Sequence, residues 1–259
     1  MKVIAIVGDE PIQRALAAKI HDVVRLTHVA RVRIKPSGRR RLIRSAISLT
    51  LARGFRRAWA GLYRHYDQQF PRWPDVATSL HDSANDEELI AAIEREQPDL
   101  VVVSGTDLLT KRTLERFATK VMNLHTGISP YIRGGPNCTN WALALGEFDL
   151  IGNTVLWIDP GIDSGAIIAS ERTPLTGRET LTELHLKVIE HGQDLYRRAV
   201  EAFVAERRLP SVPQRSIAAG RLFYTREWNG AAMIRAIFNH RFRYEPFTPR
   251  PEINLVQFD

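Results

Sequence analysis

The sequence predicts an α/β protein, with a Rossmann-like, open and mostly parallel sheet flanked by helices and a small C-terminal extension. The chain opens with a compact apolar run at Val3–Val7, then Gly8 and a helix-like pattern from Pro11 to about Val23. This order is typical of a strand–loop–helix unit. Further on, Pro98–Ser104 holds an unbroken apolar run, as expected of a strand buried on both faces of a parallel sheet.

The remaining elements follow from periodicity and from glycine and proline positions. His28–Ile34 is expected to be a second strand, and a helical stripe runs from Leu42 to Tyr66 until Pro71 and Pro74 stop it. Later patterns predict helices over Ser83–Glu96, Thr110–Phe117, Trp141–Leu145 and Arg178–Arg207, and strands over Thr119–Asn123, Ile151–Trp157 and Ala166–Ala169. The spacing between residues 98 and 123 predicts a right-handed parallel crossover. We expect a catalytic domain over residues 1–208, with a basic helical insertion at about 35–75, and an extension over 209–259.

The bulk composition is ordinary for a globular protein. The 259 residues are 44% hydrophobic and 25% charged, enough for a sizeable core. No apolar run approaches the roughly 20 residues that cross a bilayer, and the N-terminus enters a strand-like run without a cleavable signal pattern. The single cysteine, Cys138, rules out an internal disulfide framework, and we expect it to be an inert small residue. A cytoplasmic protein without a membrane partner is expected.

Positive charge is concentrated in one stretch. The net charge is +7, and no acidic residue lies between Arg31 and Arg64. Such a stretch could contact nucleic acid, an anionic membrane surface or a phosphorylated ligand. A solvated helix face or an oligomer contact, a homodimer included, is the favoured alternative because no nucleic-acid motif accompanies it. The first loop, Gly8-Asp-Glu-Pro, lacks the dinucleotide-binding glycine spacing.

Three residues on two predicted strand ends carry the chemistry. Asn123 and His125 lie two positions apart at the end of a short apolar strand, so their side chains share a face. Asp163 lies in a turn, Pro160-Gly-Ile-Asp-Ser-Gly165, that could hold a carboxylate against the imidazole. Each residue alone has an ordinary structural explanation: a strand cap, a satisfied polar group or a turn closure. Together they suit proton transfer beside a polarised carbonyl.

The segments Asn123–Gly134 and Pro160–Ile168 resemble the N10-formyltetrahydrofolate-dependent formyltransferase family, whose members share an Asn-x-His…Asp site and a Pro-x-x-Arg-Gly loop. The resemblance covers residues 98 to 202 well. It implies that His125 is the base or proton shuttle for an attacking amine, that Asp163 pairs with it, and that Asn123 donates to the formyl oxygen. The segment Thr126–Pro130 differs from the Ser-Leu-Leu-Pro of many relatives, while the proton-transfer residues are intact.

The resemblance also implies ligands. The formyl donor would be N10-formyltetrahydrofolate, with no metal. Its pterin would contact the loop and turn residues Ser104, Gly105, Thr106, Asp107, Leu108, Leu109, Asp159, Gly161 and Ile162, largely through backbone groups. Candidate acceptor contacts are Tyr131, Arg133, Gly134 and Trp141, since arginine suits phosphate and aromatic rings suit a base or sugar face. Helix packing is the alternative for Trp141.

The family members differ in the amine they formylate. Methionyl-tRNA formyltransferases usually carry a longer C-terminal domain than the residues after Pro210, and glycinamide ribonucleotide formyltransferases are more compact. We therefore expect a sugar N-formyltransferase acting on a nucleotide-linked amino sugar for surface polysaccharide, such as lipopolysaccharide O-antigen. GDP-perosamine is one candidate acceptor. Within the family, a methionyl-tRNA or glycinamide ribonucleotide formyltransferase is the alternative. Outside enzymology, the alternative is a nucleic-acid-binding protein that uses the basic helix.

Overall fold

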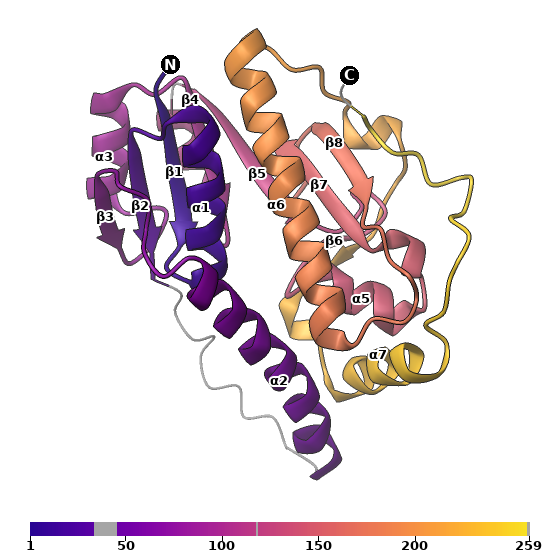
Figure 1. Cartoon of the computed structure of the whole chain (residues 1–259). Coiled ribbons are helices and arrows are strands. Elements are labelled where there is room, and N and C mark those ends of the chain that lie inside the picture. Colours follow the sequence, from indigo (N-terminus) through magenta and orange to yellow (C-terminus); the bar gives the residue numbers. More distant parts are fainter. Residues whose placement is uncertain (34–45, 118, 258–259) are drawn as a thin grey trace.

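The computed structural model describes residues 1–33, 46–117 and 119–257. Its centre is a seven-stranded sheet in the order β3-β2-β1-β4-β5-β7-β8 (Figure 1). The strands are β1 (Val3–Gly8), β2 (His28–Val32), β3 (Thr78–His81), β4 (Leu100–Ser104), β5 (Lys120–Thr126), β7 (Gly152–Trp157) and β8 (Ile167–Arg172). Pairing is parallel from β3 to β5, and β7 and β8 are antiparallel. The predicted open, mostly parallel α/β sheet is confirmed.

Helices cover both faces of this sheet (Figure 1). They are α1 (Pro11–Val24), α2 (Ala46–Gln69), α3 (Glu87–Glu96), α4 (Lys111–Arg116), α5 (Cys138–Leu145), α6 (Leu181–Glu206) and α7 (Gly230–Phe242). Because side chains alternate along a strand, Val3 and Ala5 join the core under α1 and α6. Ile4 and Ile6 join the opposite core, formed with Ile90 of α3.

Two helix starts are set by caps rather than by the apolar pattern. Helix α3 begins after Asp86, whose side chain accepts a hydrogen bond from the Glu88 amide. Helix α6 begins after Thr180, which forms a reciprocal capping box with Glu183. Both helices therefore start three or four positions later than the sequence pattern predicts.

Several short elements are absent from the sequence predictions. Strand β3 lies at a sheet edge and has a mostly exposed pattern, so no apolar run marks it. A separate two-stranded sheet pairs β6 (Arg133–Gly134) with β9 (Leu222–Phe223), too short for any periodicity. The predicted strand ending at Asn123 continues to Thr126, which places His125 inside the strand.

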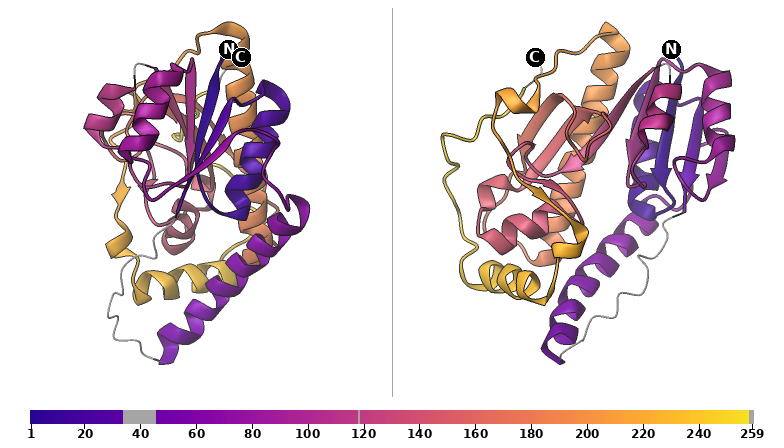
Figure 2. Two further views of the ribbon diagram at one scale, coloured as in Figure 1. Left: turned by 90° about the vertical axis from the view of Figure 1, so that its left-hand side faces the viewer. Right: turned by 180° about the vertical axis from the view of Figure 1, so that it is seen from behind.

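The C-terminal extension packs along one side of the body (Figure 2). Helix α7 contacts α5, and Ala232, Ala236 and Ile253 share a buried core with Trp141 and Phe148. Among the described helices, none is long and apolar enough to span a bilayer.

The described part of the basic segment lies largely on α2. Its apolar stripe is confirmed from Phe55 onward, since Leu62 and Tyr66 are fully buried, and α2 contacts α1 and α6. The predicted start of this helix at Leu42, the end of the second strand at Ile34, and the arginines 39, 40, 41 and 44 lie outside the described residues.

Candidate active site

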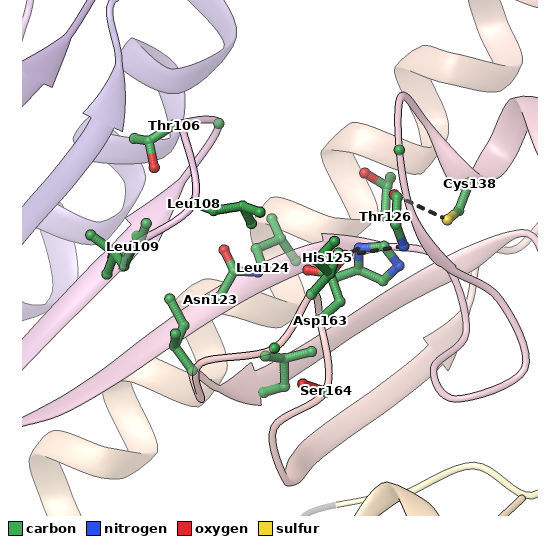
Figure 3. Close-up of a pocket in the computed structure, with 18 of the residues that line it drawn as sticks. Thr106, Leu108, Leu109, Asn123, Leu124, His125, Thr126, Cys138, Asp163 and Ser164 are labelled. Atoms are coloured by element: carbon green, nitrogen blue, oxygen red, sulfur yellow. Dashed lines mark hydrogen bonds and ion pairs between the residues drawn. The ribbon is translucent and has the colours of Figure 1, made fainter. Parts of the chain in front are cut away.

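A pocket of about 420 Å³ opens where β4 ends beside the continuing β5 (Figure 3). The last β4–β5 pair joins Val103 to Asn123, so the final three residues of β5 extend past β4. On its other side β5 stays paired with β7 as far as Thr126. One wall of the pocket is therefore the loop after β4, and the other is the turn between β7 and β8. We call these the donor loop (residues 105–109) and the acid turn (residues 159–165).

His125 and Asp163 meet in this pocket as predicted (Figure 3). The His125 Nδ1 lies 3.3 Å from the Asp163 Oδ2, and the two side chains are 8% and 16% exposed. The Asp163 Oδ2 also accepts a hydrogen bond of 3.1 Å from the Gly134 amide. The His125 Nε2 lies 3.3 Å from the Ile132 carbonyl oxygen. A proton on either ring nitrogen therefore has an oxygen acceptor.

Gly127 makes room for this imidazole. Its φ is +145°, and a Cβ there would lie 2.9 Å from the His125 Nε2 and 2.7 Å from the Cys138 Cβ. The Cys138 thiol is buried and donates to the Gly134 carbonyl oxygen at 3.5 Å. Burial raises the pKa of the Cys138 thiol, and the nearby Asp163 charge raises it further. These surroundings favour a neutral thiol, which is a poor nucleophile.

Asn123 lines the same pocket from two positions upstream on β5 (Figure 3). It is half-buried. Within the described part of the chain, its side-chain amide makes no hydrogen bond, so it is available to a bound oxygen.

The donor loop and the acid turn supply most of the residues predicted to bind the cofactor. Gly105, Thr106, Asp107, Leu108, Leu109, Asp159, Gly161 and Ile162 all line the pocket. Ser104 does not; it is buried and lines a neighbouring pocket. The Asp159 Oδ1 accepts from the Gly161 amide at 3.1 Å and from Ser164 Oγ at 2.5 Å, so this carboxylate closes the acid turn.

Of the four residues predicted to contact the acceptor, only Gly134 lines this pocket. Arg133 lines a separate depression with Pro213. The Tyr131 hydroxyl donates to the Glu252 carbonyl oxygen, which tethers the C-terminal segment. Trp141 is only 4% exposed and stacks on a ring of the extension. The side chains of Tyr131, Arg133 and Trp141 thus lie outside the pocket that holds His125, and their role at the acceptor stays a prediction.

A second pocket of about 350 Å³ adjoins the first. The two share Gly105, Leu124, Thr126, Pro136 and Asn137. The second pocket lies by the loops that follow β1 and β4, where the strand order reverses, which is the usual binding place in open α/β sheets.

The second pocket has an acidic and aromatic wall that sequence reasoning missed. Glu10, Trp59 and Tyr63 line it, and the Tyr63 hydroxyl donates to the Glu10 Oε1 at 2.7 Å. Burial raises the pKa of the Glu10 carboxyl, although the bond from Tyr63 opposes this. The position of Glu10 directly after the first strand is the signal that could have pointed to it.

Metal ligands are not clustered in the described part of the chain: no group of three or more His, Cys, Asp or Glu side chains there could hold an ion.

The chain is similar to known formyltransferases in sequence and in fold. A methionyl-tRNA formyltransferase from Finegoldia magna is 32% identical over 120 residues, which cover 46% of this chain and only 38% of that protein. An N-formyltransferase from Helicobacter canadensis, solved with folinic acid and dTDP-3-aminofucose, has a TM-score of 0.56 at 17% identity, covering 96% of this chain and 85% of that one. A phosphoribosylglycinamide formyltransferase from Anaplasma phagocytophilum has a TM-score of 0.57 at 16% identity, covering 87% and 98%.

At 17% and 16% identity, these two structural matches show only that the fold is shared. The family model described as formyl transferase matches residues 10–200, a span that includes β4, β5 and the acid turn. The resemblance seen in the sequence is thereby confirmed at the level of the family: the chain belongs to the formyl transferase family.

Proposed function

We propose that this protein is an N-formyltransferase that moves a formyl group from N10-formyltetrahydrofolate to the primary amine of a nucleotide-linked amino sugar. The observation that carries the proposal is the convergence of Asn123, His125 and Asp163 in one pocket. A base, its carboxylate partner and an amide donor are the groups that acyl transfer to an amine requires.

The donor loop and the acid turn suit a flat heteroaromatic ligand. Leu108 and Leu109 offer apolar surface, and Leu108 is 61% exposed. Backbone groups of Gly105 and Gly161 line the same pocket, where they can bond to ring nitrogens and amino groups. These residues fit the pterin of a folate, which would supply the activated formyl group.

Each of the three polar side chains has a separate role in the proposed reaction. His125 takes the proton that the amine loses as its nitrogen bonds to the formyl carbon. Asp163 stabilises the positive imidazolium so formed. Asn123 donates to the formyl oxygen as negative charge develops there. When the bond from carbon to the donor nitrogen breaks, His125 returns the proton to that nitrogen, and the products are an amide and the deformylated folate.

The second pocket is the proposed acceptor side. Trp59 and Tyr63 offer ring faces and edges for the apolar side of a sugar. The Glu10 carboxyl is an acceptor for sugar hydroxyls or for an ammonium group. The pocket shares Leu124 and Thr126 with the first one, so a ligand in it approaches the strand that carries His125.

Methionyl-tRNA is the second candidate acceptor, favoured by the 32% identity to a methionyl-tRNA formyltransferase. An RNA substrate would need a basic surface. In the described part of the basic segment, Arg31 pairs with Asp9 at 3.6 Å and Arg33 with Asp82 at 2.5 Å. These two cations are therefore partly neutralised, whereas Arg53, Arg57 and Arg64 on α2 are exposed, so charge alone does not separate the two acceptors.

A substrate panel tests the proposal. The purified protein is incubated with N10-formyltetrahydrofolate and either GDP-, dTDP- or UDP-linked amino sugars, initiator methionyl-tRNA or glycinamide ribonucleotide. We expect formylated product, detected by mass spectrometry, with at least one amino sugar. Formylation of methionyl-tRNA or glycinamide ribonucleotide alone would overturn the sugar assignment, and no donor turnover with any amine would overturn formyl transfer.

Variants of the second pocket test the acceptor side. Trp59→Ala should raise the KM for the sugar roughly tenfold, since stacking on an aromatic ring contributes about 1 kcal/mol or more, with the KM for the folate unchanged. The control is Trp73→Phe, outside both pockets, where Arg31 lies over the ring. A rise in the folate KM alone would place the acceptor elsewhere.

A further inference from the structure

The acid turn holds its carboxylate in a backbone conformation that needs support. Asp163 has a φ of +47°, in the left-handed region that residues with a side chain rarely adopt. Left unsupported, such a residue returns readily to a common conformation. The support comes from outside the catalytic core, from the C-terminal extension.

Gln214 supplies the most direct support. Its Nε2 donates to the Asp163 carbonyl oxygen at 2.7 Å and to the Gly165 carbonyl oxygen at 2.8 Å. Both hydrogens of the amide are thus used on two carbonyls of one turn. Gln214 is only 6% exposed, so water competes little for these bonds.

Gln214 is itself anchored to the sheet. Two residues earlier, Val212 forms a bridge with Ile167 of β8 through reciprocal backbone bonds of 2.9 and 2.8 Å. Gln214 then begins a short 3-10 helix that continues to Ser216. Its amide therefore meets the acid turn from a fixed position.

The same extension fixes the other partner of the carboxylate. Strand β9 pairs with β6, and the Gly135 amide donates to the Phe223 carbonyl oxygen at 3.0 Å. This pairing holds the Gly134 amide, which donates to the Asp163 Oδ2. Gln214 thus hydrogen-bonds the backbone of Asp163, and the Gly134 amide of β6, the strand that pairs with β9 of the extension, hydrogen-bonds its carboxylate.

We propose that Gln214 is a positioning residue for the reaction: it sets the Asp163 carboxylate against His125. The inference rests on the proposed role of Asp163 in formyl transfer. An amide side chain fits this task because it offers two donors to two acceptors. A glutamate would face the same carbonyls with an oxygen anion, and a leucine would leave them unpaired.

A double-mutant cycle tests this inference. Gln214→Leu and Asp163→Asn are made singly and together, and kcat and KM are measured with the acceptor found in the panel. Gln214→Leu should lower kcat by roughly 10- to 100-fold, because small misplacements of a catalytic group cost about that much. The folate KM should change less than kcat, because the donor loop on the other wall of the pocket is untouched. In the Asp163→Asn background the same change should have no further effect on kcat, since coupled residues are not additive.

Controls separate positioning from folding. Ser216→Ala removes one bond, to the Pro213 carbonyl oxygen at 2.7 Å, from the same short helix without touching the acid turn, and should leave kcat unchanged. Thermal unfolding of each variant checks the fold. If Gln214→Leu does not fold, Gln214→Glu is used in its place, with the same expectation.

The outcomes are distinct. Additive losses in the cycle, or a Gln214 variant with wild-type kcat, would overturn the positioning role while formyl transfer stands. An inactive wild-type protein would overturn the proposed function instead, and a crystal structure of the Gln214 variant then decides the positioning alone. We expect Asp163 to leave its positive φ and to lie beyond hydrogen-bond distance of His125; an unmoved Asp163 would contradict the proposal.

Discussion

The donor loop and the acid turn line one pocket but are held by different parts of the chain. The donor loop is held by Asp107, whose carboxylate accepts from Ser83 Oγ at 2.5 Å and from the Ala84 amide at 2.8 Å. These partners come just before α3, in the same half of the sheet. The acid turn is held by Gln214 and, through Gly134, by β9.

Under the proposed function both walls contact the folate, but only the acid turn carries a proton-transfer group. Damage near Asp107 should disturb the folate site, because the partners of that carboxylate hold the donor loop and make no hydrogen bond to the described residues of the acid turn. Damage to the extension should disturb the proton-transfer pair, because the extension holds the backbone of Asp163 and the strand beside it. Four substitutions test the contrast, from the largest expected effect to the smallest.

Asp163→Asn should give the largest loss, a fall in kcat of roughly 10²- to 10⁴-fold, as expected when a proton-transfer group is disabled. The amide keeps the shape but cannot stabilise an imidazolium. The folate KM should stay within about threefold, since asparagine keeps the shape of the acid turn and the donor loop is untouched. Steady-state kinetics with varied folate checks both values; His125→Asn should show a similar loss, and an active Asp163→Asn protein would remove Asp163 from the mechanism.

Gly134→Ala should have the second-largest effect, because it disrupts the β6–β9 pairing that connects the extension to the site. Gly134 has a φ of +94°, and a Cβ there would lie 2.0 Å from the Phe223 carbonyl oxygen. The left-handed conformation costs a residue with a side chain about 1–2 kcal/mol, so we expect a melting temperature lower by about 2–8 °C and a reduced kcat. The control is Gly54→Ala, where nothing lies within 4 Å; equal behaviour of the two variants would contradict the role of the β6–β9 pair.

Asp107→Ala should act on binding rather than on chemistry. Its loss frees the donor loop from Ser83 and Ala84, and with bonds of about 0.5–1.5 kcal/mol each the folate KM should rise roughly tenfold. The kcat at saturating folate should change little. The exposed Asp75→Ala is the control, and a fall in kcat without a change in KM would show that the two walls are not separate.

Glu179→Gln should leave the site intact and affect only stability. Burial alone would raise the pKa of Glu179, but bonds from Lys187, the Thr176 amide and Tyr244 outweigh it and hold that pKa well below its ordinary value. A lowered pKa means that this stabilisation is present near neutral pH and is lost as the pH falls below about 5.

At pH 7 we expect the free energy of unfolding of Glu179→Gln to be lower than that of the wild type by about 2 kcal/mol, because charged hydrogen bonds are lost. Between pH 6 and pH 4 the variant should lose less stability than the wild type. Urea titrations at several pH values measure this, with the exposed Glu206→Gln as control. An unchanged kcat would show that the extension affects the chemistry through its contacts near Asp163 and not through Glu179.

Much of the sheet was predictable because its signals are local. The runs Val3–Val7 and Pro98–Ser104 are apolar without interruption, since strands between two helical layers must be. The edge strand β3 and the pair β6–β9 carry no such signal; partners distant in the sequence, not periodicity, make them strands. The starts of α3 and α6 could be predicted only to within a few residues, because an apolar stripe does not show which polar side chain caps the helix N-terminus.

For the site, the sequence alone was enough to predict that Asn123, His125 and Asp163 would meet in one pocket. Asn123 and His125 share a strand face by the twofold period of a strand, and the turn residues around Asp163 mark a second loop, so local geometry and the family motif sufficed. Only the tertiary structure decided that Trp141 and Tyr131 serve the extension, that Glu10 and Tyr63 form a second pocket, and that Gln214 grips the acid turn. Those contacts join residues about 50 to 120 positions apart, and no local pattern encodes which distant backbone a side chain will meet.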